Sequence, residues 1–199
     1  MLDALARLDT AVLLAVHRGW RSPAGDAFFL WITQARHFLI PLVVLWLGFI
    51  VLGGRRGRWI AAALVVTLLL TDPISVQILK PLVDRVRPCF TVDGVQALLP
   101  QPRSPSFPSS HAANSFGAAT VLFAARRRWW AIGFLVAGAV SLSRVYTGVH
   151  YPSDVLGGAV LGVACGALVW RVAAALDRRG RRSAASSNAP ELERANGPR

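Results

Sequence analysis

Long apolar stretches separated by short arginine-rich segments dominate the chain. Five of them approach the length of a bilayer crossing, and they cover residues 28–52, 59–79, 112–125, 129–142 and 155–176. A helix that rises 1.5 Å per residue needs about 20 residues to cross the hydrocarbon core. The pattern therefore predicts an all-α, integral membrane helical bundle of about five spans. The third stretch is the shortest and least apolar, so its helix is expected to begin below the membrane surface.

The N-terminal residues follow a different pattern. Apolar side chains recur there at helical spacing, with charged residues between them; the apolar positions are Leu2, Leu5, Leu8, Val12, Leu13 and Val16. The longest uncharged run, residues 10–16, is too short to cross a bilayer. We therefore predict an amphipathic helix that lies on the outer interface, with a short sixth span as the alternative.

Composition supports a membrane protein over a soluble one. The 199 residues are 54% apolar and 16% charged, whereas soluble domains carry about 25% charged residues. The 22 Lys and Arg exceed the 10 Asp and Glu, for a net charge of +12. Such an excess also suits nucleic acid, but here the arginines lie between apolar stretches, as is typical of membrane loops. The expected partner is thus the bilayer and not nucleic acid.

The basic clusters predict an orientation. In a five-span arrangement the arginines at 55–58, 126–128 and 178–182 all fall on one side, which the positive-inside rule makes cytoplasmic. Segments 80–111 and 143–154 then face outward, as expected for a multi-pass protein of the cell membrane. The domain is predicted to cover residues 1–179. The remaining residues, 180–199, are predicted to form a disordered basic tail.

The two outward segments contain three polar clusters with a chemistry in common. Lys80, Arg87 and Arg144 supply cations, and the arginine fork matches phosphate oxygens. Ser109 and Ser110 precede an apolar helix, where hydroxyls and the free N–H groups of a first turn can bind an anion. Together these residues predict a site for a phosphoryl group.

Two histidines and an aspartate complete the pattern. His111 and His150 can divide nucleophilic and acid–base roles. Asp154 follows His150 by four residues, close enough through one helical turn to hold an imidazole N–H. Taken singly, each residue has a structural interpretation: an interfacial cation, a helix cap, or a hydrogen-bonded histidine. Their convergence on one side of the membrane favours an active site.

The three clusters resemble the signature of the type 2 phosphatidic acid phosphatase (PAP2) superfamily, in its membrane lipid phosphatase branch. The family pattern is K-x6-R-P, then P-S-G-H, then S-R-x5-H-x3-D. Its first and third parts are complete here, from Lys80 to Arg87 and from Arg144 to Asp154. The second part departs at Ser110, where the family usually has glycine.

The resemblance implies a role for each matching residue. His150 is similar to the family's nucleophile, which forms a phosphohistidine, and Asp154 to the residue that orients it. His111 resembles the general acid. The phosphoryl oxygens would be bound by the remaining matching residues, which are Lys80, Arg87, Ser109, Ser110 and Arg144. No metal or other cofactor is implied, because the cations stand in for one.

The expected function is hydrolysis of a phosphomonoester or diphosphate on a lipid. A site on the outer side favours undecaprenyl pyrophosphate or another polyprenyl phosphate, where carrier lipid is recycled. Phosphatidic acid and phosphatidylglycerophosphate are alternative substrates. A lipid phosphotransferase using the same site, or a basic protein that only binds anionic lipid, are alternative functions. The sequence does not specify the oligomeric state.

Overall fold

A computed structural model of the chain describes the backbone of residues 2–100, 103–126 and 130–195. The α-helices in these ranges are α1 (Leu2–Gly19), α2 (Pro23–Thr33), α3 (Leu39–Val51), α4 (Gly54–Pro73), α5 (Lys80–Val83), α6 (Ser110–Ala125), α7 (Trp130–Tyr146) and α8 (Pro152–Ala195). A π-helix, Ile74–Leu79, joins α4 to α5, and 3-10 turns cover Ala35–His37 and Pro88–Phe90. The described residues form no strands, so the all-α prediction is confirmed.

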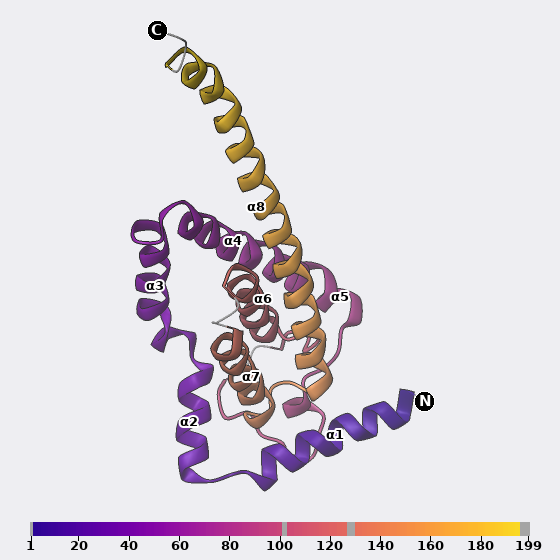
Figure 1. Cartoon of the computed structure of the whole chain (residues 1–199). Coiled ribbons are helices and arrows are strands. Elements are labelled where there is room, and N and C mark those ends of the chain that lie inside the picture. The colour runs from indigo at the N-terminus through magenta and orange to yellow at the C-terminus, as the bar shows by residue number, and fades with distance from the viewer. Residues whose placement is uncertain (1, 101–102, 127–129, 196–199) are drawn as a thin grey trace.

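Helix α6 lies at the centre of the bundle. It contacts α4, α7 and α8 (Figure 1), and the closest packing is against α8. The buried face of α6 is built largely from small residues, which allow backbones to approach closely; they include Ala112, Ala113, Gly117 and Ala119. This helix therefore carries its first residues, Ser110 and His111, into the middle of the molecule.

The glycines of α8 explain the close packing. Gly158, Gly162 and Gly166 recur every fourth residue on the face toward α6, as the spacing predicts for helix packing. An added Cβ at Gly162 would collide with the Ala113 carbonyl oxygen, and one at Gly166 would lie 2.6 Å from the Gly117 carbonyl oxygen. The stripe thus fixes the start of α8 beside the start of α6.

Apolar helical segments support insertion in a bilayer. Among the described residues, Gly54–Val83 and Pro152–Arg182 are long and apolar enough to cross one, and Leu39–Val51 and Ile132–Tyr146 are shorter apolar helical segments. Large apolar side chains on these segments are exposed, as lipid-facing residues would be; examples are Leu69, Leu135 and Val160. The count of five spans stays a prediction.

The first apolar stretch, residues 28–52, is divided where Arg36 and His37 interrupt its apolar run. Helix α2 ends at Thr33, the backbone of Gln34 is extended, and a 3-10 turn over Ala35–His37 precedes α3. His37 Nδ1 lies 3.0 Å from the Trp31 carbonyl oxygen at this break. Pro41 lacks an N–H and is tolerated only near a helix start, which suits its place in the first turn of α3.

Helix α1 is an amphipathic helix, as predicted, but it is docked on the protein. Leu13 and Val16 are buried in a cluster with residues from the end of α7, such as Tyr146. Leu5 and Leu8 remain exposed. Figure 1 shows α1 running across the end of the bundle at which α8 begins. Its contact with the outer membrane interface stays a prediction.

Helix α8 continues well beyond the bundle (Figure 1), where the sequence predicts a disordered tail. The backbone is helical to Ala195, so the prediction is wrong for residues 180–195. Residues 196–199 lie outside the described residues. A physical reason is that a helix already formed propagates easily through Arg- and Ala-rich sequence. The separation of residues 1–179 as a domain stays a prediction.

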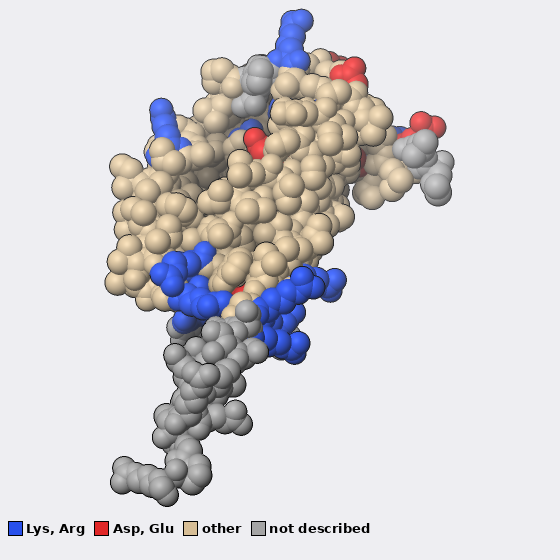
Figure 2. Space-filling model, turned by 90° about the horizontal axis from the view of Figure 1, so that it is seen from above, with Lys and Arg blue, Asp and Glu red and all other residues tan. Residues whose placement is uncertain are grey.

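The largest group of exposed Lys and Arg side chains in Figure 2 lies at one end of the molecule, while single basic side chains lie elsewhere on the same face. Arg55, next to the start of α4, forms a 2.6 Å ion pair with Asp177 of α8, and Arg56 donates to the Ala125 carbonyl at the end of α6. The ends of α4, α6 and α8 that carry the basic clusters are therefore together. Arg127 and Arg128 of the predicted clusters lie outside the described residues. The opposite helix ends carry the polar motifs.

The close packing of α6 and α8 generates a stability prediction. Gly162→Ala should lower the free energy of unfolding by about 1–3 kcal/mol, because the new methyl group meets backbone of α6. Gly138→Ala in α7 is the matched control, since no heavy atom lies within 4 Å of its added Cβ. Thermal unfolding in detergent compares the two variants. Equal unfolding temperatures would contradict this account of the helix pair.

Candidate active site

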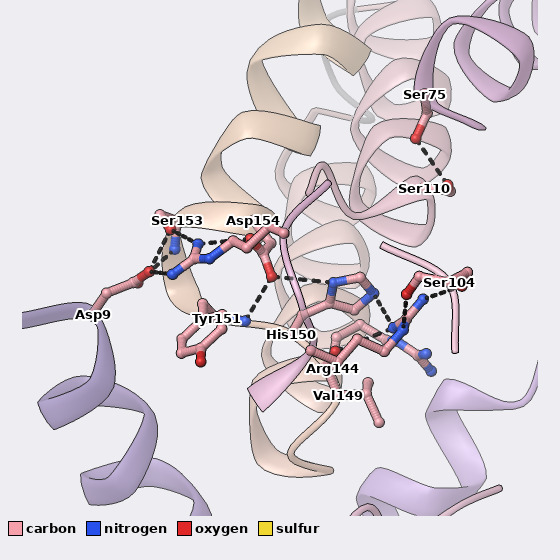
Figure 3. Close-up of polar contacts among 12 residues, drawn as sticks. Asp9, Ser75, Ser104, Ser110, Arg144, Val149, His150, Tyr151, Ser153 and Asp154 are labelled. Atoms are coloured by element: carbon pink, nitrogen blue, oxygen red, sulfur yellow. Dashed lines mark hydrogen bonds and ion pairs between the residues drawn. The ribbon is translucent and has the colours of Figure 1, made fainter. Parts of the chain in front are cut away.

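The predicted site residues converge at the end of the bundle opposite the basic clusters. Lys80 comes from α5, Arg87 from the following loop, and Arg144 from the last turn of α7. His150 lies in the loop before α8, and Asp154 lies in its first turn (Figure 3). The start of α6 joins them, since the Ser109 N–H donates to the Asp154 carbonyl oxygen at 2.9 Å.

A π-helix positions Lys80. The Lys80 N–H donates to the carbonyl of Ser75, five residues earlier, so the helix is wider there than a regular α-helix. Lys80 itself is buried. Helix α5 ends at Asp84 in the left-handed conformation, with φ of 44°, which Asp adopts more readily than most residues. That turn directs the chain into the segment that carries Arg85 and Arg87.

Arg87 is held rigidly by protein groups. Its Nε donates to the Ser104 carbonyl at 3.0 Å and its Nη2 to the Ser104 hydroxyl at 3.1 Å. Its Nη1 donates to the Val149 carbonyl at 3.1 Å and lies 3.2 Å from His150 Nε2. Burial lowers the pKa of the guanidinium. A cation fixed in this way attracts an anion without a cost of reorganisation.

The contact with Arg87 assigns the tautomer of His150. A guanidinium has donors but no acceptor, so Nε2 of His150 accepts and carries a lone pair. The proton of the neutral imidazole is then on Nδ1, which faces Asp154 Oδ2 at 3.5 Å. This distance is longer than a hydrogen bond, and catalytic contacts of this kind shorten when substrate binds. His150 thus presents an unprotonated nitrogen, which Arg87 contacts, to the cationic side of the site.

Asp154 is fully buried and held by two stronger contacts. Its Oδ2 accepts the Tyr151 N–H at 2.9 Å, and its Oδ1 accepts from Arg85 Nη1 at 2.8 Å (Figure 3). A buried carboxylate needs such partners to remain ionised. The carboxylate is therefore fixed in place beside the imidazole that it orients.

Arg144 and Ser109 provide donors that the protein leaves unused. Arg144 Nη1 donates to the Thr33 hydroxyl at 2.5 Å, but its buried Nε has no partner in the described part of the chain. The buried Ser109 hydroxyl likewise has none there. A buried donor without a partner costs about 1–3 kcal/mol. Both donors suit the oxygens of a phosphoryl group.

Ser110, where the family usually has glycine, is accommodated by a second serine. Its hydroxyl lies 2.9 Å from that of Ser75 in the π-helix, and the two hydrogen bond (Figure 3). The Ser110 hydroxyl, which a glycine would lack, therefore has a hydrogen-bond partner in the π-helix that follows α4. As the first residue of α6, Ser110 still offers a backbone N–H that the helix does not use.

Cations and burial keep both histidines neutral. The pKa of His150 falls to about 4, first through burial and then through Arg144 and Arg87, although Asp154 partly offsets them. His111 lies just ahead of the predicted span 112–125. Unlike His150, its side chain is exposed. Its pKa is lowered to about 3 by the desolvation it still undergoes among the surrounding groups and then by the charges of Arg144, His150, Lys80 and Arg87. A bound phosphate dianion would offset these cations and raise the pKa of His111.

Sequence reasoning missed several residues that position the predicted ones. Thr33 and Ser104 hold Arg144 and Arg87, and Arg85 holds Asp154. Arg85 lies inside the first motif, but the motif defines only Lys80 and Arg87. No sequence pattern around Thr33 could predict its hydrogen bond with Arg144, because that bond depends on how α2 packs against α7. Within the described residues, no group of three or more His, Cys, Asp or Glu is arranged to hold a metal ion.

Comparisons with known proteins agree with this geometry. Residues 59–178 match the family model described as the PAP2 superfamily. The chain is 32% identical over 198 residues to the lipid A 4'-phosphatase of Bacteroides thetaiotaomicron, covering 90% of this chain and 83% of that protein. It is 36% identical over 124 residues to the undecaprenyl-diphosphatase of Sulfolobus acidocaldarius, covering 62% of this chain and 57% of that protein.

A solved structure is also similar. The crystal structure of LpxE from Aquifex aeolicus superimposes with a TM-score of 0.70 at 30% identity, covering 82% of this chain and 95% of that one. The family model covers more than half of the chain, and the polar motifs within it lie together at one end of the bundle. The chain therefore belongs to the PAP2 superfamily and is a membrane lipid phosphatase.

Proposed function

We propose that the chain hydrolyses a phosphomonoester or diphosphate on a lipid through a phosphohistidine at His150, with undecaprenyl pyrophosphate or another polyprenyl phosphate as its substrate. The observation that carries this proposal is the contact between Arg87 and His150 Nε2, because it places an unprotonated imidazole nitrogen beside a fixed cation that a phosphoryl oxygen can take over as a partner. Lys80, Arg144 and Ser109 would bind the other phosphoryl oxygens. Phosphoryl transfer depends on such electrostatic positioning.

In the first step, Nε2 of His150 attacks phosphorus and the bond to the leaving oxygen breaks. His111 donates its proton to that oxygen, while Asp154 stabilises the Nδ1–H of the phosphorylated imidazole. In the second step, His111 takes a proton from water, and the water oxygen attacks phosphorus. The P–N bond then breaks, which releases phosphate and restores both histidines.

The two ends of the bundle support an outward-facing site in a multi-pass protein of the cell membrane. The basic clusters gather at one end (Figure 2), and the positive-inside rule places that end in the cytoplasm. The site lies at the other end, where a lipid headgroup is available while its tails stay in the bilayer. Polyprenyl carrier lipids are presented on that side, and a relative is named for an undecaprenyl diphosphate substrate.

Phosphate release from the purified protein in detergent tests the proposal. The panel contains undecaprenyl pyrophosphate, undecaprenyl phosphate, lipid A, phosphatidic acid and phosphatidylglycerophosphate. We expect the highest kcat/KM with a polyprenyl substrate, and loss of about four orders of magnitude in His150→Ala, as when other catalytic nucleophiles are removed. Full activity in that variant would contradict the mechanism. A higher value for another lipid would contradict the substrate, and transfer to an acceptor without free phosphate would indicate a phosphotransferase.

The Ser75–Ser110 contact generates a second prediction. Ser110→Gly should retain turnover within about tenfold of the original, because the serine hydroxyl faces Ser75 and the backbone N–H that serves the phosphate is kept. Ser75→Ala, which removes the partner hydroxyl, is the matched variant. Initial rates with the preferred lipid provide the measurement. Abolished activity in Ser110→Gly would show that the hydroxyl itself binds substrate.

The lowered histidine pKa values generate a pH prediction. His150 must be neutral to attack, so kcat/KM, which reports the free enzyme, should fall on the acid side only as the pH drops through about 4. His111 must be protonated in the substrate complex, where the bound dianion raises its pKa from about 3 toward its ordinary 6.5. We therefore expect kcat to decline on the alkaline side. A profile that is flat between pH 5 and 9 would count against two-histidine catalysis.

A further inference from the structure

We propose that Asp9, on the N-terminal helix α1, is a positioning residue for the reaction. It holds Arg85, which in turn holds Asp154, the carboxylate that orients His150. This inference rests on the proposed function, since it concerns how Asp154 is held in position beside His150. Asp9 lies more than 70 positions before Lys80, the first residue of the PAP2 motifs. Helix α1 would therefore contribute to catalysis although it lies outside those motifs.

Arg85 lies between two carboxylates. Its Nη2 donates to Asp9 Oδ2 at 2.7 Å, and its Nη1 donates to Asp154 Oδ1 at 2.8 Å (Figure 3). The guanidinium also lies over the Tyr151 ring, 3.8 Å from its centroid. These contacts fix the plane of the guanidinium as well as its position. Arg85 therefore has little freedom to move relative to Asp154.

Asp9 also binds the first turn of α8 directly. Its Oδ1 accepts the Ser153 N–H at 2.9 Å, and its Oδ2 accepts from the Ser153 hydroxyl (Figure 3). A carboxylate at the N-terminus of a helix is stabilised by the free N–H groups and the helix dipole. Asp9 is 8% exposed, so these contacts are shielded from water. It thereby fastens α1 to the residue next to Asp154.

The charge balance explains why a second carboxylate matters. If Arg85 faced Asp154 alone, a single cation would neutralise the carboxylate and weaken its attraction for the imidazole. Asp9 shares that cation, so Asp154 keeps more negative charge beside His150 Nδ1. That charge stabilises the imidazole as it gains positive charge during attack. Asp9 is remote from the phosphoryl group, so its effect is expected on kcat and not on KM.

Helix α1 also contacts the bundle away from Asp9. His17 Nδ1 lies 2.7 Å from the Tyr146 carbonyl oxygen, Arg18 donates to the Asp93 carbonyl at 2.5 Å, and Leu13 is fully buried. The helix is thus docked at three further points along its length. Its outward face, with Leu5 and Leu8, stays exposed.

Kinetics of Asp9→Asn in the full chain test the inference. We expect kcat to fall by about ten- to a hundredfold, as for other residues that orient a catalytic group, with KM changed by less than about twofold. Asp3→Asn, an equal change of charge at an exposed position of α1, should behave as the original protein. Arg18→Ala, which removes a docking contact of α1 elsewhere, should leave kcat unchanged if the effect belongs to Asp9.

A double-mutant cycle with Arg85→Gln separates positioning from a general structural role. Because Asp9 acts through Arg85, Asp9→Asn should have little further effect on kcat in the Arg85→Gln background. Additive losses, or wild-type kcat in Asp9→Asn, would overturn the inference. If Asp9→Asn does not fold, Ser153→Ala still removes a hydroxyl that both Asp9 and Arg85 contact, and unchanged kcat there would overturn it too. Retained activity in His150→Ala would instead refute the proposed function.

Discussion

The structure depends on three cations held close together and largely out of water. Lys80, Arg87 and Arg144 repel one another, and each also loses hydration on burial. The bundle compensates by fixing Arg87 through Ser104 and Arg144 through Thr33, so that the guanidinium groups cannot move apart. The remaining positive charge suits a phosphoryl dianion and lowers the pKa of both histidines.

The packing of the helices serves this arrangement. Small residues let α6 and α8 approach until the Ser109 N–H reaches the Asp154 carbonyl, which places the start of one helix beside the start of the other. The π-helix after α4 brings Lys80 to the same point and gives Ser110 a partner in Ser75. Helix α1 then packs beside the site, where Asp9 binds Arg85 and Arg85 binds Asp154. The contacts that hold the helices together thus also hold the site residues.

Much of this could be predicted from the sequence, because it depends on local spacing. The His150–Asp154 interval of one helical turn, the glycines of α8 and the apolar helical segments all follow from periodicity. The pairings of Asp9 with Arg85 and of Thr33 with Arg144 could not be predicted, because they join residues 76 and 111 positions apart and depend on how helices dock. The helical backbone of residues 180–195 also escaped prediction, because their polar composition is typical of a disordered tail.

The account's central claim is that His150 forms a covalent bond to the phosphoryl group. Rapid acid-free quenching of turnover with a lipid labelled in its phosphoryl group, followed by peptide mapping, tests it most directly. We predict an alkali-stable, acid-labile label on His150 that is absent from His150→Ala. A label on another residue, or none while phosphate is still being released, would contradict the claim.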